Sequence, residues 1–312
     1  MLGYFVKRVL LIIPTVIVVT LVIFLLMASL TGTDTFRMVT YADDAGTGNS
    51  VLSQFFVYIW HVLTKFDFGV DPSTRRPITN ELLRHYGFTM RMTGAALLLT
   101  LLIGVPAGIF AAVRRGSAGD RAVSAVTMVI SAVPSFCIAF GFVMFFAVKL
   151  RWLNVLMMDK TDYIMPMGTI VLSVVASITR ITRTAMCEVL DKQYVTAMRS
   201  LGLRNRSVVY RHALKNALVP IVSVISSIVG YLICGCIVVD RFFSLPGLGM
   251  YLANAIRSRT TNTVLAAAIF ISFTMCCVGV LADAVYLIVN PAMRENVSWR
   301  SGRLARGKEG RA

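Results

Sequence analysis

Charged side chains are scarce in this sequence, and acidic ones are especially few. Asp, Glu, Lys and Arg together make up 15% of the 312 residues, with 15 acidic residues against 31 basic ones. Hydrophobic residues make up 57%, whereas soluble globular domains usually contain about 45–50% of such residues. The composition therefore argues against a soluble protein and indicates an integral membrane protein.

The motifs by which a chain would hydrolyse ATP or a peptide bond are also missing. No G-x-x-x-x-G-K-[ST] phosphate-binding loop occurs, and the one Gly-Lys pair, Gly307-Lys308, is followed by Glu309. Neither an H-E-x-x-H zinc motif nor a G-x-S-x-G nucleophile motif is present. We therefore predict no catalytic residue and no cofactor in this chain, and expect its energy source on another subunit.

Histidine and cysteine are present but are not spaced as metal ligands or disulfides. His61, His85 and His212 are far apart in the sequence, which argues against a metal site. The six cysteines lack C-x-x-C spacing and a neighbouring histidine, so small buried apolar side chains are the favoured interpretation. They are Cys137, Cys187, Cys234, Cys236, Cys276 and Cys277.

The formal net charge is +16, and the distribution of the basic residues predicts the orientation in the membrane. With a cytoplasmic N-terminus, the inner segments carry 19 Lys and Arg residues and the outer segments 12. Six of those 12 lie in one long outer loop, which counts little in the positive-inside rule. Both termini are therefore expected in the cytoplasm, near anionic lipids. No nucleic-acid motif is present, so nucleic-acid binding is not expected.

Six apolar stretches are long enough to cross a bilayer, and they predict an all-α polytopic membrane protein. The first has 22 residues and would cover about 33 Å as a helix, against a hydrocarbon core about 30 Å thick. It is too long for a typical signal sequence, and Ala28-Ser29-Leu30 is a poor cleavage site, so a retained helix is expected. The predicted spans are Val9–Leu30, Thr93–Val113, Ala122–Val148, Tyr163–Thr179, Ala217–Val239 and Val264–Val289.

These spans divide the chain into four regions. Residues 1–30 form the first helix with its cytoplasmic start, and residues 31–92 form an outer segment. Within the outer segment, Val51–Thr64 is rich in aromatic residues but too short to span, so an interfacial helix is expected. Residues 93–289 form a five-helix core that includes a cytoplasmic loop at 180–216, and residues 290–312 form a basic cytoplasmic tail.

Three residues inside the predicted spans are candidates for a transport pathway. Pro106 and Pro134 each remove a helix hydrogen-bond donor and permit a kink, which serves either a pathway or ordinary packing. Asp283 is the one ionisable residue well inside a predicted span, where a carboxylate costs about 2.5–3.5 kcal/mol. A structural hydrogen bond or a pair with a cytoplasmic arginine is favoured for Asp283 over a proton relay or a substrate contact.

The most polar stretch of any length is the cytoplasmic segment Tyr194–Pro220, "YVTAMRSLGLRNRSVVYRHALKNALVP". A helix is expected over Glu188–Leu201, and Gly202 suits the left-handed conformation that ends a helix. Asn205 or Ser207 would then cap a second helix. One apolar stripe on the first helix comprises Tyr194, Ala197, Met198 and Leu201. The segment could anchor the orientation, lie on lipid or dock a soluble partner, and the spaced stripe favours docking.

Several fragments occur in an order that is typical of one family. They are "FVKRVLLIIPT", "KFDFG" with "RRPI", "IGVPAGIFAAVRRGS" with "DR", "AVPSF", "FFSLPGLG" and "LADAVYLIVNPAMR". Between "AVPSF" and "FFSLPGLG" lies "YVTAMRSLG" followed by "RHALKNALVP", a short helix, a glycine and a helix that ends in a Leu-Pro-like run. Together these fragments, which cover nearly the whole chain, resemble the inner-membrane permease subunits of binding-protein-dependent ABC importers, in their dipeptide and oligopeptide branch.

The resemblance implies that the polar cytoplasmic segment holds a coupling helix, which fits a cleft on an ATPase and transmits its closure to the spans. The implied coupling residues are Tyr194, Ala197, Met198, Arg199, Leu201, Gly202 and Leu203. The turn after the fifth span would meet an extracytoplasmic binding protein. The residues of that turn are Phe243, Pro246, Gly247 and Gly249, and a tight turn before the next helix would explain its proline and glycines equally well.

The family also implies the partners and the location. The expected complex has a second, homologous permease, two ATPase subunits that bind ATP and Mg²⁺, and a binding protein, in a bacterial cytoplasmic membrane. Three departures bear on the substrate subtype and on the fit of the coupling helix. "TGTD" stands where Pro-Gly-Asp-Pro is usual after the first span, Met198 where a small residue is common, and Asn290 where an Asp is common before the proline.

The leading hypothesis is therefore a transport subunit that forms half of a pathway and imports di- or oligopeptides by alternating access. Relatives also carry glutathione or nickel chelates, and the sequence does not separate these cargoes. An ion-coupled secondary transporter would need several intramembrane ionisable groups and internal repeats, but Asp283 stands alone. A membrane-embedded enzyme would need the motifs that are missing.

Overall fold

The protein is built from helices of very different lengths. The computed structural model describes residues 6, 8–31, 51–71, 75–154 and 163–289, and the predictions for 32–50 and for the tail at 290–312 lie outside them. Within the described ranges there is no strand, only an isolated bridge between Val70 and Pro77, so the all-α prediction is confirmed. The main helices are α2 (Ile12–Thr31), α4 (Val51–Lys65), α5 (Ile78–Val113), α6 (Ala118–Ala132), α7 (Ser135–Phe142), α8 (Ile164–Leu190), α9 (Gln193–Ser200), α11 (Leu214–Phe242), α12 (Leu248–Arg257) and α13 (Thr261–Val289).

Five helical stretches of the described chain are long and apolar enough to cross a membrane. They are Arg8–Ser29, Ile78–Val113, Ile164–Leu190, Asn205–Ile225 and Thr261–Val285. A sixth span is obtained if the bent pair α6 and α7, with the π-helical turn η2 (Val143–Lys149) that continues α7, is counted as one. The sequence predicted six spans, and length and composition give five, or six when the bent pair is counted as one.

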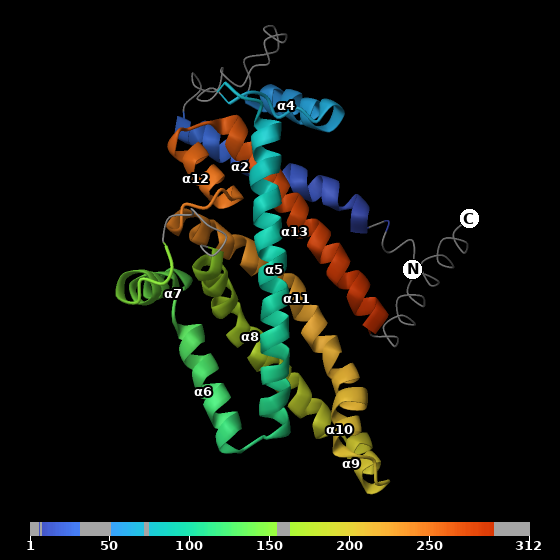
Figure 1. Cartoon of the computed structure of the whole chain (residues 1–312). Helices are drawn as coiled ribbons and strands as arrows, with labels where there is room; N and C mark the ends of the chain where they lie inside the picture. Colours follow the sequence, from blue (N-terminus) through green and yellow to red (C-terminus); the bar gives the residue numbers. More distant parts are fainter. Residues whose placement is uncertain (1–5, 7, 32–50, 72–74, 155–162, 290–312) are drawn as a thin grey trace, which may run out of the picture. The chain divides into compact units, whose positions relative to one another are not determined.

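Two of these helices extend well beyond the predicted spans. α5 has 36 residues and begins at Ile78 rather than at Thr93, so it is about 54 Å long. Figure 1 shows it as one uninterrupted helix. α8 continues past Thr179 to Leu190. Hydrophobicity marks only the part of a helix that lies in lipid, and polar residues prolong both helices without breaking their backbone hydrogen bonds.

The two prolines of interest act differently. Pro106 lies inside α5, which continues to Val113. Pro134 separates α6 from α7, and the two halves are bent by 100°. Val133 before it is extended, with φ −92° and ψ 123°, because a residue that precedes proline is disfavoured in the α region. The span predicted at Ala122–Val148 is therefore broken at Pro134, which is more than the expected kink (Figure 1).

The described residues cluster into two compact units, to both of which α5, α11 and α13 contribute. In the unit formed mainly by residues 93–154 and 163–235, α6 and α7 pack on α8. α5 also meets α8 closely in this unit, through Gly104 and Gly108. A Cβ at Gly108 would lie 2.6 Å from the carbonyl oxygen of Thr179, so only glycine permits this approach.

The other unit, which comprises the described parts of residues 9–92 and 236–277, has an aromatic core. Phe24 of α2 packs edge-to-face on Phe55 of α4, with ring centroids 5.1 Å apart. Tyr58 and Val62 follow Phe55 at helical spacing and are also buried. The helix predicted at Val51–Thr64 is thus confirmed as α4, and its place at the membrane interface stays a prediction.

Candidate functional site

Helix α9 ends in a left-handed glycine cap. Gly202 has φ +80°, and its N–H donates to the carbonyl of Arg199 at 3.0 Å. The N–H of Leu203 donates to the carbonyl of Met198 at 3.3 Å. These two bonds form a Schellman motif, which satisfies the last carbonyl groups of a helix. The left-handed conformation predicted for Gly202 is confirmed.

The helix before this cap is shorter than the one predicted over Glu188–Leu201. Glu188 belongs to α8, and the chain breaks at Asp191 and Lys192 before α9 begins. Lys192 is extended, with ψ 145°. The carboxylate of Asp191 accepts a hydrogen bond from Arg115 at 2.7 Å, and this contact raises the pKa of Arg115. The prediction of one helix was wrong because residues 188–190 continue the spanning helix.

The predicted apolar stripe is divided between the core of the chain and its surface. Tyr194 is half-buried against the apolar cluster of α8 and α11, and its hydroxyl accepts a hydrogen bond from Nδ2 of Asn216 at 2.8 Å. Met198 is half-buried as well. Val195 lay outside the predicted stripe, yet it is fully buried. These three residues attach α9 to its own chain.

Five of the predicted coupling residues remain exposed, and they surround the glycine cap. They are Ala197, Arg199, Leu201, Gly202 and Leu203. Leu201 is 80% exposed and Leu203 is 43% exposed. Burying an aliphatic side chain of this size contributes about 1.5–3 kcal/mol, so the two leucines are the large apolar side chains of this set that a partner could cover.

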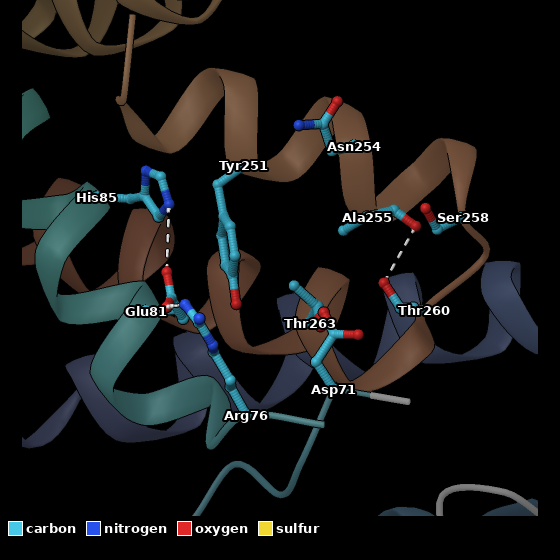
Figure 2. Close-up of a pocket in the computed structure, with 10 residues that line it drawn as sticks. All are labelled: Asp71, Arg76, Glu81, His85, Tyr251, Asn254, Ala255, Ser258, Thr260 and Thr263. Atoms are coloured by element: carbon cyan, nitrogen blue, oxygen red, sulfur yellow. Dashed lines mark hydrogen bonds and ion pairs between the residues drawn. The ribbon is translucent and has the colours of Figure 1, made fainter. Parts of the chain in front are cut away.

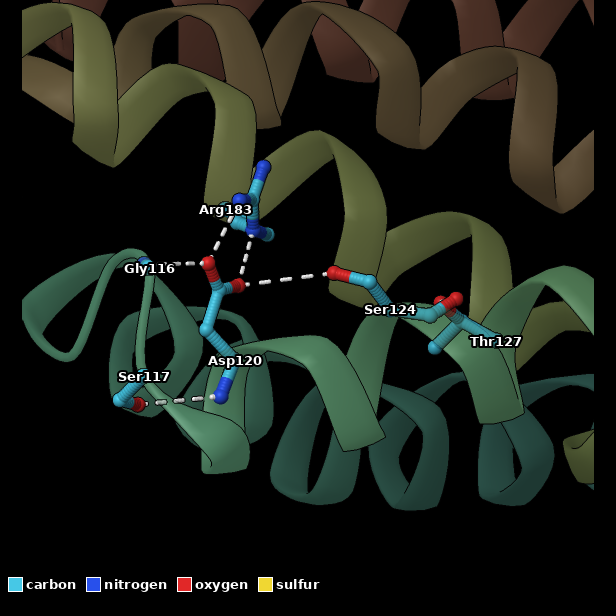
Figure 3. Close-up of polar contacts among 6 residues, drawn as sticks. All are labelled: Gly116, Ser117, Asp120, Ser124, Thr127 and Arg183. Atoms are coloured by element: carbon cyan, nitrogen blue, oxygen red, sulfur yellow. Dashed lines mark hydrogen bonds and ion pairs between the residues drawn. The ribbon is translucent and has the colours of Figure 1, made fainter.

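The turn between α5 and α6 is tied to α8 by a buried ion pair (Figure 3). Asp120, in the first turn of α6, is 3% exposed. It accepts hydrogen bonds from Nε of Arg183 at 2.6 Å and from Nη2 at 2.8 Å. The same carboxylate accepts the N–H of Gly116 at 2.9 Å, while Ser117 caps α6. A two-pronged arginine contact of this kind fixes both distance and orientation.

A cavity of about 180 Å³ lies beside this turn and is lined in part by α9. Arg115 and Asp191, which are paired, stand on its wall together with Arg199 and Asn205. Arg199 therefore lies on the wall of a polar cavity and also near the exposed C-terminal end of α9. The ion pairs of Arg115 and Arg183 hold the C-terminal end of α8, which α9 follows, against the α5–α6 turn.

The turn after α11 is packed rather than exposed. Its predicted contact residues are Phe243, Pro246, Gly247 and Gly249, and of these Pro246 alone is exposed. A Cβ at Gly247 would collide with the carboxylate of Asp240, and a Cβ at Gly249 with the backbone of Ile237. Close packing thus explains both glycines. This is the tight-turn alternative that the sequence left open.

Side chains from two other helices cap the first turn of α12. The N–H of Leu248 donates to Oγ1 of Thr89 at 2.8 Å, and the N–H of Gly249 donates to Oδ2 of Asp240 at 3.2 Å. Asp240 lies beyond the predicted span at Ala217–Val239 and is 1% exposed. Burial raises its pKa to about 7, so a carboxyl group that titrates near neutral pH supports this turn.

A polar cavity of about 230 Å³ opens beside α12 (Figure 2). Its walls come from the segment before α5, the starts of α5 and α13, and the middle and end of α12. Charged and aromatic side chains in it are Asp71, Arg76, Glu81, His85 and Tyr251. The ring of His85 stacks on Tyr251 with centroids 4.7 Å apart, and its Nδ1 lies 2.9 Å from the carbonyl oxygen of Pro246. Burial raises the pKa of Tyr251 to about 12.

The carboxylate predicted inside the last span, Asp283, is paired with an arginine. Nη1 of Arg8 contacts its Oδ2. Arg8 lies in the basic start of the chain, which is expected in the cytoplasm. The contact supports the structural interpretation of Asp283 over a proton relay.

Sequence reasoning missed the residues that hold these sites together. Asp120 and Arg183 are 63 residues apart, and the contact of Leu248 with Thr89 spans 159 residues. A weak signal was available for Asp240, since it is an acidic residue that directly follows an apolar run and precedes the "FFSLPGLG" turn. Nothing in the local sequence identifies its partners.

Comparison with known proteins places these features in a family. Residues 104–295 match the model of a family described as binding-protein-dependent transport system inner membrane component. The glutathione transport system permease protein GsiC of Pectobacterium atrosepticum is 31% identical over 310 residues, which cover 94% of this chain and 99% of that protein. GsiC of Escherichia coli K12 is 31% identical over 307 residues, with the same coverage.

A solved structure shares the fold at low sequence identity. A chain of the MetNI methionine ABC transporter in an inward-facing conformation matches with a TM-score of 0.54 and 18% identity. The match covers 67% of this chain and 96% of that chain. It bears on the helical arrangement alone.

Proposed function

The chain belongs to the inner-membrane components of binding-protein-dependent transport systems, and on this premise we propose that it forms half of a pathway that imports di- or oligopeptides. As an ABC importer permease it is a multi-pass protein of the inner membrane. We further propose that the complex contains a second permease and two ATPase subunits that hold ATP and Mg²⁺. The chain itself contacts membrane lipids in this proposal.

One observation carries the coupling part of the proposal: the capped end of α9 leaves Leu201 and Leu203 exposed on a rigid turn. A partner that covered both leucines would gain apolar burial without having to order the turn, because the Schellman bonds already fix it. Gly202 is also exposed, so a partner surface can approach the backbone closely. This geometry suits contact with a soluble ATPase, whose movement would be transmitted through the rigid turn at the end of α9.

The cargo has two candidates, both with peptide bonds. The fragments of the sequence resemble the dipeptide and oligopeptide branch. The relatives at 31% identity are named glutathione permeases, which favours glutathione, itself a tripeptide, as the second candidate. Both cargoes use the same proposed machinery and differ in what the binding protein delivers.

Reconstituted transport tests the proposal. The complete importer, placed in proteoliposomes with its binding protein outside, should take up a radiolabelled dipeptide or tetrapeptide only when ATP is inside. Glutathione should be tested in parallel, and as a competitor. Uptake of glutathione alone would select the second candidate. Uptake that needs an ion gradient and no ATP would overturn the proposed mechanism.

A further inference from the structure

The polar cavity beside α12 (Figure 2) carries more negative than positive charge. Asp71 and Glu81 contribute two carboxylates, and Arg76 contributes one guanidinium group. Arg76 is 70% exposed and reaches Oε1 of Glu81 with one hydrogen bond of 3.2 Å. Exposed pairs of this kind contribute little net attraction, so Arg76 can be displaced from Glu81 by another cation.

The rest of the cavity wall suits a cation as well. Figure 2 shows the ring of Tyr251 standing between His85 on one side and Thr263 on the other. His85 stacks on one face of this ring, and the opposite face is turned toward the threonine side of the cavity. Oγ1 of Thr263 donates to Asp71 at 3.3 Å, which keeps that carboxylate on the cavity wall. Carboxylates beside an aromatic face attract ammonium and guanidinium groups.

The size of the cavity limits what can enter it. Its volume is about 230 Å³, below the range of about 300–1,000 Å³ that is typical for complete small-molecule sites. The cavity therefore fits a single side chain better than a whole cargo molecule. The elements that line it belong to the segments predicted outside the membrane, where a binding protein would approach.

We propose that this cavity receives a lysine or arginine side chain of the extracytoplasmic binding protein. The proposal rests on the proposed function, because it takes this face of the chain as the docking face. The incoming cation replaces Arg76 at Glu81, so the two residues act in opposite directions. Loss of Glu81 weakens docking, and loss of Arg76 strengthens it by removing the internal competitor.

Binding measurements with charge variants test whether the loss of Glu81 and the loss of Arg76 change the docking affinity in opposite directions. The complete importer in nanodiscs is titrated with its own binding protein at low ionic strength. Glu81→Gln should raise Kd about tenfold, Glu81→Asp should restore most of the affinity, and Arg76→Gln should lower Kd about threefold. Arg84→Gln removes one positive charge, as Arg76→Gln does, but from a residue of α5 outside the cavity lining. It serves as the matched control for Arg76→Gln. Basal ATPase activity and thermal midpoints show whether each variant is folded.

A small probe tests the chemistry of the cavity directly. n-Butylguanidinium should compete with the binding protein for the unaltered importer and lose this effect in Glu81→Gln, whereas n-butanol should have no effect. Equal Kd values for all variants, or weakened docking in Arg76→Gln with none in Glu81→Gln, overturn the proposal while the transport function stands. If the binding protein does not stimulate uptake by the unaltered importer, the proposed function itself fails.

Discussion

Gly202 shows how one backbone conformation serves a candidate docking surface. Its φ of +80° is available to glycine at no cost, and no atom lies within 4 Å of the position of an added Cβ. A substitution there acts through the backbone conformation and not through a clash. A substitution at Gly202 therefore tests the backbone geometry of the cap without creating a clash with the residues around it.

Gly202→Val should weaken association with the ATPase while leaving membrane insertion intact. The left-handed conformation costs a residue with a side chain about 1–2 kcal/mol, and β-branching adds to this cost. Gly202→Asn is the matched control, because asparagine is the second choice at this position of a helix cap. Co-purification of the ATPase with each variant measures the effect. An unchanged yield for the valine variant would count against a coupling role for α9.

Asp240 should make stability fall as the pH rises toward neutral. Its carboxyl group has a pKa of about 7 in the folded protein and an ordinary value of 3.8, so between these values the folded protein holds a proton that the unfolded chain has lost. Folding is then favoured at low pH, by up to about 4 kcal/mol over this interval, and the advantage is lost as the pH passes 7. The thermal midpoint in detergent should drop between pH 5 and pH 8, and Asp240→Asn should reduce that drop. Identical pH profiles for the two proteins would contradict the protonated state.

At the scale of elements, the sequence predicts where helices cross lipid but not where they end. The apolar run from Thr93 marks the spanning part of α5, while the helix begins at Ile78 because polar residues there continue its hydrogen bonding. Local rules succeeded at Gly202, where one residue type determines the geometry, and at Pro134 they located the bend but predicted a kink where the helix is broken. They failed for Val195 and Asp120, since burial and ion pairing depend on residues that are distant in the sequence.

The close crossing of α5 and α8 should be sensitive to a substitution at Gly108, one of its two glycines. In Gly108→Ala the new methyl group would lie 2.6 Å from both the carbonyl oxygen of Thr179 and Cβ of Thr182, so the helices must separate at a cost of about 1–3 kcal/mol. Gly94→Ala makes the same change in the same helix where nothing lies within 4 Å, and it should be neutral or stabilising. Thermal midpoints in detergent compare the two. Equal midpoints would show that α5 and α8 do not pack at this distance in the protein.

For the whole molecule, the family assignment gives one explanation for features that lie in different compact units. One unit carries the capped end of α9, and the other carries the α12 turn and the polar cavity. An importer needs a face toward an energy source and a face toward a cargo donor. The positive-inside rule assigns the first to the cytoplasm and the second to the outside, so orientation is the assumption on which both proposals depend.

Cysteine labelling tests this orientation. In a variant without the six native cysteines, Ser207→Cys places a thiol after α9 and Ser258→Cys places one at the end of α12. An impermeant maleimide should label Ser258→Cys in intact spheroplasts and Ser207→Cys only in inside-out vesicles, because the reagent cannot cross the bilayer to the basic side. Retained uptake shows that each variant is folded. Labelling of Ser207→Cys in intact spheroplasts would reverse the topology, and α9 would then face away from every source of ATP.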